Sequence, residues 1–158
     1  MPANAAKFVD AIVTQLESGG FRVTPVELAH EDVVRAFRAT RRGGWGAATI
    51  VVAELRAIAG DRAKAFFSEG YDVEEQTRRL LRPPGLTMTM GVSEAVDPEA
   101  KEWVRHRWLE NFGLPVIVDA GTGEIVFRDR LTLLEAFDLV MKRRLVRRYV
   151  VPAVARSS

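Results

Sequence analysis

The stretch that decides the fold is Gly113-Leu-Pro-Val-Ile-Val-Asp-Ala-Gly-Thr-Gly-Glu-Ile-Val-Phe127. Val116 to Val118 form a β-branched run, Asp119 to Gly123 supply turn residues, and Ile125 to Phe127 resume the apolar run. Two apolar runs joined by a glycine-rich polar link predict a β-hairpin. Because amphipathic helices are predicted on both sides, we expect this hairpin to lie inside the sheet and to start the core.

The rest of the chain alternates between helical and strand-like patterns. Apolar spacing predicts helices over 5–18, 30–42, 61–69, a further segment opening at Asp72, one opening at 97–99, and about 132–148. Glycine is expected to end the 61–69 helix at Gly70. Strands are expected over 21–28, 48–53 and 86–90, although 48–58 also fits one continuous helix. The sequence therefore predicts an α/β (α+β) fold with a mixed sheet of about four or five strands, helices packed on it, and a C-terminal hairpin followed by a long helix.

Length and composition favour one domain over residues 1–158. The chain is 47% hydrophobic and 28% charged and contains no cysteine, which excludes disulfides, thiolate catalysis and cysteine metal sites. The first residues do not read as a signal peptide, and no apolar run approaches the ~20 residues of a membrane span. We expect a soluble cytoplasmic protein. Residues 149–158 are predicted to form an edge strand or an extended arm.

From residue 86 onward the expected order is strand, helix, hairpin, helix, with Leu114-Pro115 entering the hairpin. This order resembles the second half of the thioredoxin-like fold, in which a proline precedes the hairpin. The resemblance implies no redox activity here, because the position of the family's paired cysteines reads Ala57-Ile-Ala-Gly60. The run 114–119 is also similar to the middle strand of CBS domains.

Arginine is concentrated in two segments. Residues 128–158 carry eight Lys or Arg against three Asp or Glu. On the expected last helix these form a basic face, and the expected helix 30–42 has a second one that precedes the loop Gly43-Gly-Trp-Gly46. A cationic face can bind phosphates, and a loop aromatic can stack on a base. The predicted nucleic-acid-binding residues are Lys142, Arg143, Arg144, Arg147 and Arg148 on the last helix, and Arg35, Arg38, Arg41, Arg42 and Trp45 in the earlier segment. The alternatives are a solvated face with cations near a helix C-terminus and a Trp45 side chain packed in the core.

Catalytic and metal-binding patterns are sparse. The only histidines are His30, where a helix cap is the simpler account, and His106, which we expect on the surface. No cofactor or metal site is predicted. Asp32 together with Glu54-Leu-Arg56 resembles the acidic site of restriction-type nucleases, but arginine replaces the tunable lysine of that motif.

Three hypotheses follow. The first is a non-catalytic protein that binds nucleic acid or another polyanion through its arginines. The second is a homodimeric interaction or scaffold module that uses the last helix or the tail. The third is a metal-dependent nuclease that uses Asp32 and Glu54. The sequence favours a protein without catalytic activity and leaves the ligand, the partner and the oligomeric state open.

Overall fold

A computed structural model describes residues 4–42, 48–81, 86–106, 113–128 and 136–157. The elements are, in chain order, α1 (Asn4–Ser18), β1 (Arg22–Val26), β2 (Val33–Arg41), β3 (Ala48–Leu55), α2 (Gly60–Leu81), β4 (Leu86–Ser93), α3 (Pro98–His106), β5 (Leu114–Asp119), β6 (Glu124–Val126), α4 (Ala136–Leu145), the π-helical turn η2 (Val146–Val150) and α5 (Val151–Ser157). The predicted α/β class is confirmed.

The strands form one mixed sheet whose spatial order follows the sequence, from β1 to β6. β1, β2 and β3 are antiparallel neighbours, β3, β4 and β5 are parallel, and β6 returns antiparallel to β5. Parallel neighbours require crossover connections, which α2 and α3 supply. The described part of the sheet has six strands, one more than the upper limit predicted.

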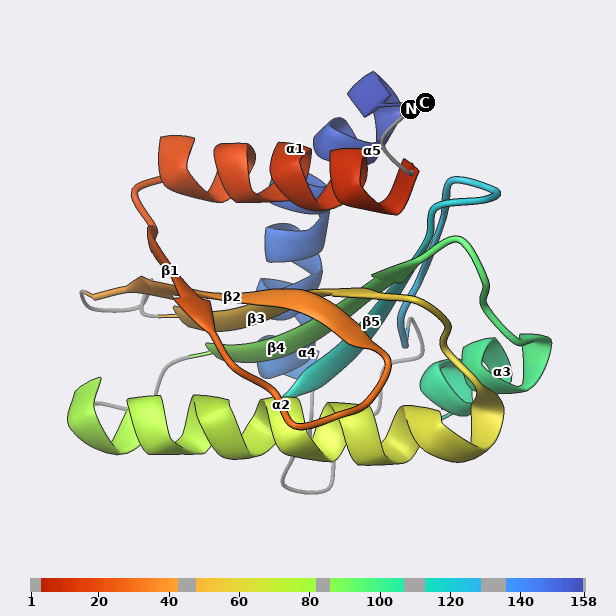
Figure 1. Ribbon diagram of the computed structural model, residues 1–158. Coiled ribbons are helices and arrows are strands. Elements are labelled where there is room, and N and C mark those ends of the chain that lie inside the picture. Colours follow the sequence, from red (N-terminus) through yellow and green to blue (C-terminus); the bar gives the residue numbers. More distant parts are fainter. Residues whose placement is uncertain (1–3, 43–47, 82–85, 107–112, 129–135, 158) are drawn as a thin grey trace.

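Helices cover both faces of the sheet (Figure 1). α1 and the C-terminal helical segment pack on one face, where Phe8, Ile12 and Val146 are at most 2% exposed. α2 and α3 pack on the other face, where Phe66 and Val104 are fully buried. Burial on both sides explains why β3 and β5 read as nearly continuous apolar runs.

The predicted hairpin is present, with Ile117 opposite Val126 and Asp119 opposite Glu124. Gly123 takes a positive φ of 77° in its turn. Every residue of β5 is buried, as expected of a core strand. β6, however, ends the described sheet rather than lying inside it, because no described strand pairs with its outer edge.

The predicted helix over 30–42 is wrong, because residues 33–41 form β2. Val33, Val34 and Phe37 fit a helical face, but the chain between β1 and β3 gains backbone hydrogen bonds on both sides. Such long-range pairing overrides the high helix propensity of alanine and arginine, because intrinsic propensity is small compared with tertiary interactions. For 48–53, the favoured strand prediction is confirmed by β3.

A single helix replaces the two predicted between residues 61 and 81. α2 runs from Gly60 to Leu81 and passes through Gly70 without a break. A Cβ atom at Gly70 would lie 2.4 Å from Thr89 Cγ2 on β4. Glycine therefore allows close approach of helix and sheet at this position and does not end the helix. The first N–H of α2, that of Gly60, donates to Asp97 Oδ2 at 3.2 Å.

The C-terminal segment is helical, so the predicted edge strand or arm over 149–158 is wrong. α4 leads through η2 into α5, and α5 lies beside α1 (Figure 1). Ala153 and Val154 are buried there in the same core cluster as Ala5 and Val9 of α1. The first part of the predicted 132–148 helix, residues 132–135, lies outside the described residues.

Candidate functional site

The C-terminal basic cluster does not form one solvated face. Arg144, Arg147 and Arg148 are exposed, whereas Arg143 is half-buried and Lys142 is only 5% exposed. Placing all five predicted residues on one binding face was therefore wrong. The three exposed arginines remain candidates for ligand contact.

A π-helical turn follows Lys142, Arg143 and Arg144 and contains Arg147 and Arg148. The N–H of Val151 donates to the carbonyl of Val146, five residues back, instead of the usual four. Pro152 follows directly, and a proline has no N–H and crowds the carbonyl four residues before it, here that of Arg148. The wider π-helical turn accommodates both the missing N–H of Pro152 and the crowding of the Arg148 carbonyl. It leaves Arg147 and Arg148 exposed while Tyr149, the next residue, is buried.

The four arginines predicted on one helix face are divided by the strand. Successive side chains of a strand point to opposite faces, so Arg35 and Arg41 share the α1 side with Phe37, and Arg38 lies on the α2 side. Arg42 follows the strand and is exposed. Trp45 lies outside the described residues.

Arg35 has a structural environment rather than an open one. Its Nε lies 2.6 Å from Glu54 Oε2, and its Nη2 lies 2.9 Å from Asp10 Oδ1. The same Nη2 donates to the carbonyl of Ala6 at 3.0 Å. Arg35 therefore ties α1 to the sheet, and we remove it from the candidate binding residues.

Tyr149 joins the two arginine segments. Arg41 Nη1 donates to Tyr149 Oη at 3.0 Å and to the carbonyl of Gly19 at 3.3 Å. The guanidinium carbon of Arg41 lies 4.6 Å from the centre of the Phe21 ring, and that of Arg148 lies 5.5 Å from the centre of the Tyr149 ring. These contacts bring β2 and η2 together at one end of the molecule. We call Arg41, Arg42, Arg144, Arg147 and Arg148 the arginine surface.

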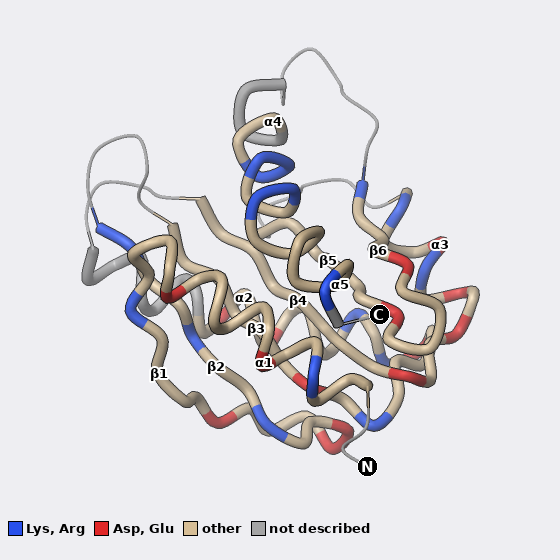
Figure 2. Tube along the Cα trace, turned by 90° about the horizontal axis from the view of Figure 1, so that it is seen from above, with Lys and Arg blue, Asp and Glu red and all other residues tan. Residues whose placement is uncertain are grey.

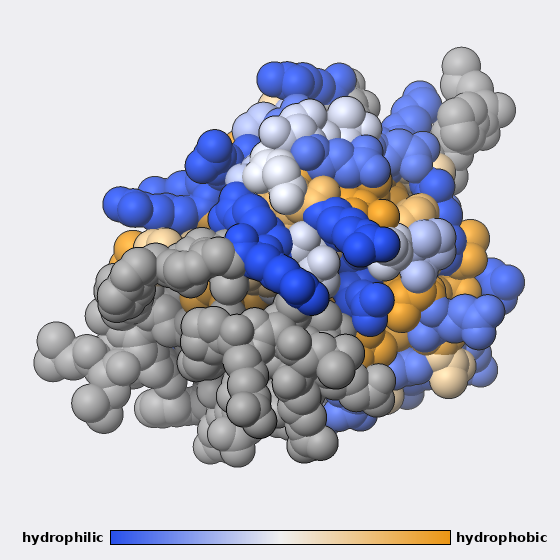
Figure 3. Space-filling model, turned by 90° about the vertical axis from the view of Figure 1, so that its left-hand side faces the viewer, coloured by the Kyte–Doolittle hydropathy of each residue, from blue (hydrophilic) through white to orange (hydrophobic). Residues whose placement is uncertain are grey.

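Basic side chains of several elements gather at this end of the molecule. Figure 2 shows Lys and Arg on α4 and at the end of β2, while Asp and Glu gather beside α3 and β6. Figure 3, which faces the end of the sheet where α1 finishes, shows hydrophilic side chains gathered over apolar ones. In the part of the chain that the structure describes, Arg42, Arg144, Arg147 and Arg148 form no ion pair with a carboxylate.

At the opposite end of the molecule, Arg62, Lys101 and Arg105 pair with carboxylates of the protein itself. Lys101 Nζ lies 2.5 Å from Asp119 Oδ2 and 2.8 Å from Glu124 Oε2. The hydrogen bonds to Asp119 and Glu124 raise the pKa of Lys101. Burial by itself would raise the pKa of Asp119, but hydrogen bonds from Lys101 and Thr122 lower it below its usual value. This network fastens α3 to the hairpin, so we assign it a structural role.

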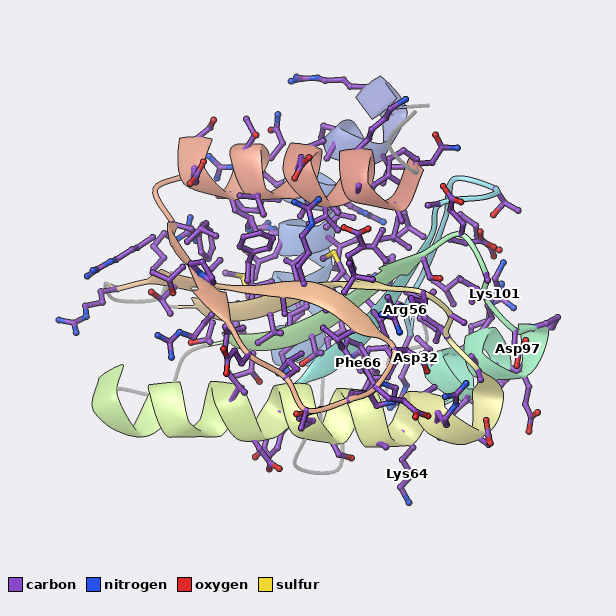
Figure 4. All side chains as sticks on the ribbon, in the orientation of Figure 1. Asp32, Arg56, Lys64, Phe66, Asp97 and Lys101 are labelled. Carbon is purple, nitrogen blue, oxygen red and sulfur yellow. The ribbon has the colours of Figure 1, made fainter. Side chains whose placement is uncertain are left out.

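The two carboxylates of the nuclease hypothesis point to different layers. Glu54 pairs with Arg35 on the α1 side, whereas Asp32 Oδ2 lies 2.9 Å from Arg62 Nη1 on α2. Asp32 lies beside the end of β3, where the N–H of Arg56 donates to the carbonyl of Asp32 at 2.9 Å (Figure 4). Within the described ranges, no three His, Cys, Asp or Glu side chains are grouped to hold a metal ion.

Each histidine contacts a neighbouring side chain. His30 lies in a turn before β2, not at a helix cap, and its ring packs edge-on against Phe66 at 5.9 Å. His106 is exposed, as predicted, and lies 3.1 Å from Glu102. Sequence analysis missed Phe21 and Tyr149 as site residues. The only local signal for Tyr149 is that it directly follows the basic pair Arg147-Arg148.

No protein-family model and no curated protein matches this chain. The likeness to the thioredoxin-like family therefore stays a prediction, resting on the order β4, α3, β5–β6 hairpin and α4. None of the helices in the described ranges combines the length and the apolarity needed to cross a bilayer.

Proposed function

We propose that this protein binds nucleic acid, without catalysing a reaction on it, through the arginine surface. Arginine suits this role because its planar guanidinium forms two parallel hydrogen bonds to phosphate and never loses its charge near neutral pH. Four of the five arginines are exposed, and Arg41 is half-buried against Phe21. A linear polyanion that crosses this end of the molecule can contact β2 and the C-terminal helix at once. As part of the same proposal we place the protein in the cytoplasm, in agreement with its lack of cysteine.

The observation that carries the proposal is the contact between Arg41 and Tyr149, which are 108 positions apart in the sequence. Through Tyr149, Arg41 of the first basic segment and Arg148 of the second contact the same side chain, which supports their joint use as one surface. An arginine that is only solvated needs no hydrogen bond to a buried tyrosine to fix its position. Fixing charged side chains before the ligand arrives reduces the entropy lost on binding.

Salt dependence of binding tests the proposal. Each arginine–phosphate contact on a duplex contributes a slope of about −0.9 to a plot of log affinity against log salt, so five contacts predict about −4.5. The affinity should then fall about 500-fold between 50 and 200 mM salt. The measurement is fluorescence anisotropy of a labelled 20-base-pair duplex, and of one of its strands, at several salt concentrations.

A matched control is available at the other end of the sheet. Arg56 and Lys64 are exposed and distant from the arginine surface (Figure 4), so a variant with both changed to Ala should bind as the parent does. The proposal fails if the parent does not bind at 50 mM salt. It also fails if the control variant loses as much affinity as a variant lacking exposed arginines of the surface.

A homodimer is the second candidate, and exposed apolar residues on the C-terminal helices favour it. Val140 on α4 is 40% exposed and Val151 on α5 is 43% exposed. Truncating residues 149–158 would remove buried Tyr149 and Val154, so it would not separate dimerisation from folding. Val151→Glu avoids that problem. We expect it to convert a dimer into a monomer in sedimentation equilibrium, and a parent that is monomeric at about 100 μM rules this candidate out.

A further inference from the structure

Two aromatic rings lie beneath the arginine surface, and neither is available to a ligand. Phe21 is 4% exposed and Tyr149 is 3% exposed. They pack edge to face, with ring centres 5.4 Å apart at an interplanar angle of 80°. Arg41 lies over Phe21 and Arg148 lies over Tyr149. Stacking of a nucleobase requires an open ring face, and the side chains of these two rings do not offer one.

Tyr149 is held by the end of α1 as well as by β2. A Cβ atom at Gly19 would lie 2.3 Å from Tyr149 Cε1, so the ring occupies space that only glycine leaves free. The carbonyl of the same glycine accepts a hydrogen bond from Arg41. Arg41 is therefore fixed by a hydroxyl, a carbonyl and a ring face together.

We infer that Phe21 and Tyr149 are positioning residues that hold Arg41 and Arg148 for phosphate groups, so that the arginine surface binds the backbone of a nucleic acid and not its bases. The inference rests on the proposed function and deepens it, because it gives the two buried rings a positioning role and excludes recognition of the bases. Binding directed at phosphates is independent of base sequence, since every nucleotide presents the same charged group.

An abasic oligonucleotide separates phosphate recognition from base recognition. The experiment compares a 20-nucleotide strand with an abasic strand of the same length and charge, at one low salt concentration. We expect the two dissociation constants to agree within about twofold. Removing a stacked base would weaken binding by about 5- to 150-fold for each base, so a loss of fivefold or more overturns the inference. Trp45→Ala, measured in parallel, then shows whether that tryptophan supplies the stacking.

A double-mutant cycle tests the positioning role. Tyr149→Phe keeps the ring and removes the hydroxyl that bonds Arg41, and we expect a 3- to 10-fold weaker affinity with an unchanged salt slope, as follows from a lost orienting hydrogen bond worth about 1 kcal/mol. In an Arg41→Ala background the same change should have no effect, because the group that it positions is gone. Tyr71→Phe, which removes the hydroxyl of the only other tyrosine, is the matched control.

An equal loss in both backgrounds, or no loss in either, overturns the positioning role. Failure of the positioning role can be distinguished from failure of the proposed nucleic-acid binding. If substituting the exposed arginines leaves binding unchanged, the proposed function itself is wrong. If those substitutions abolish binding but the abasic strand binds poorly, only the present inference fails.

Discussion

Gly70→Ala tests whether this glycine serves the packing of α2 on β4. The added methyl group would lie 2.4 Å from Thr89 Cγ2 and 2.7 Å from its Oγ1, and Thr89 is 2% exposed and cannot move into solvent. Overpacking of this kind costs about 1–3 kcal/mol. Replacing glycine by alanine inside a helix returns about 0.8–1 kcal/mol. We therefore expect the free energy of unfolding to fall by about 1 kcal/mol, with a decrease of about 2–4 °C in Tm.

The same change in a Thr89→Ala background separates this explanation from a helix-ending role. Thr89→Ala removes Cγ2 and Oγ1 and leaves Cβ at 3.1 Å, so most of the clash is relieved and the gain in helix propensity remains. Gly70→Ala should then stabilise the protein by up to about 1 kcal/mol relative to Thr89→Ala alone. Urea unfolding at 25 °C measures all four proteins of the cycle. Equal destabilisation in both backgrounds, or stabilisation of the parent by Gly70→Ala, would refute the reasoning.

Two further predictions concern the ends of the molecule. Because hydrogen bonds to Asp119 hold its pKa below the unfolded value, its contribution to stability is complete above that value and is lost as the pH falls through the folded pKa. Asp119→Asn should lower the free energy of unfolding at pH 7 by about 1–3 kcal/mol. The free energy of unfolding of this variant should also fall less below pH 4 than that of the parent. Urea midpoints from pH 7 to 2.5 measure both effects, and a pH profile equal to that of the parent would contradict the prediction. Gly19→Ala should displace the Tyr149 ring and so cost about 1–3 kcal/mol of stability and weaken nucleic-acid binding, measured by urea unfolding and anisotropy. Parent-like binding by Gly19→Ala would show that the ring position does not matter.

Local patterns predicted α1, β4 and the hairpin, although β4 and β5 are buried on both faces. α1 buries one apolar stripe, β4 alternates with Met88 and Met90 on one face, and the hairpin combines apolar runs with a glycine turn. β2 escaped prediction because arginines lie on both of its faces and their partners are remote. Arg35 pairs with Glu54, and Arg41 bonds Tyr149, so the pairing that makes this segment a strand is not visible in its own sequence.

The candidate site was predicted by residue type but not by arrangement. Arg144, Arg147 and Arg148 are exposed as expected, whereas the burial of Lys142 could not be read from helical periodicity. The π-helical turn changes which side of the helix the following residues face. Pro152 alone did not predict that turn. The role of Tyr149 depends on contacts with α1, β1 and β2, which only the tertiary structure brings together.

The central claim is that exposed arginines from two distant segments form one phosphate-binding surface. The most direct measurement is the salt slope of duplex binding for the parent and for a variant with Arg42, Arg144, Arg147 and Arg148 changed to Ala. Removing four phosphate contacts should reduce the magnitude of the slope by about 3.6, from about 4.5 to about 0.9. Equal slopes for the two proteins would contradict the claim and would place the binding surface elsewhere on the molecule.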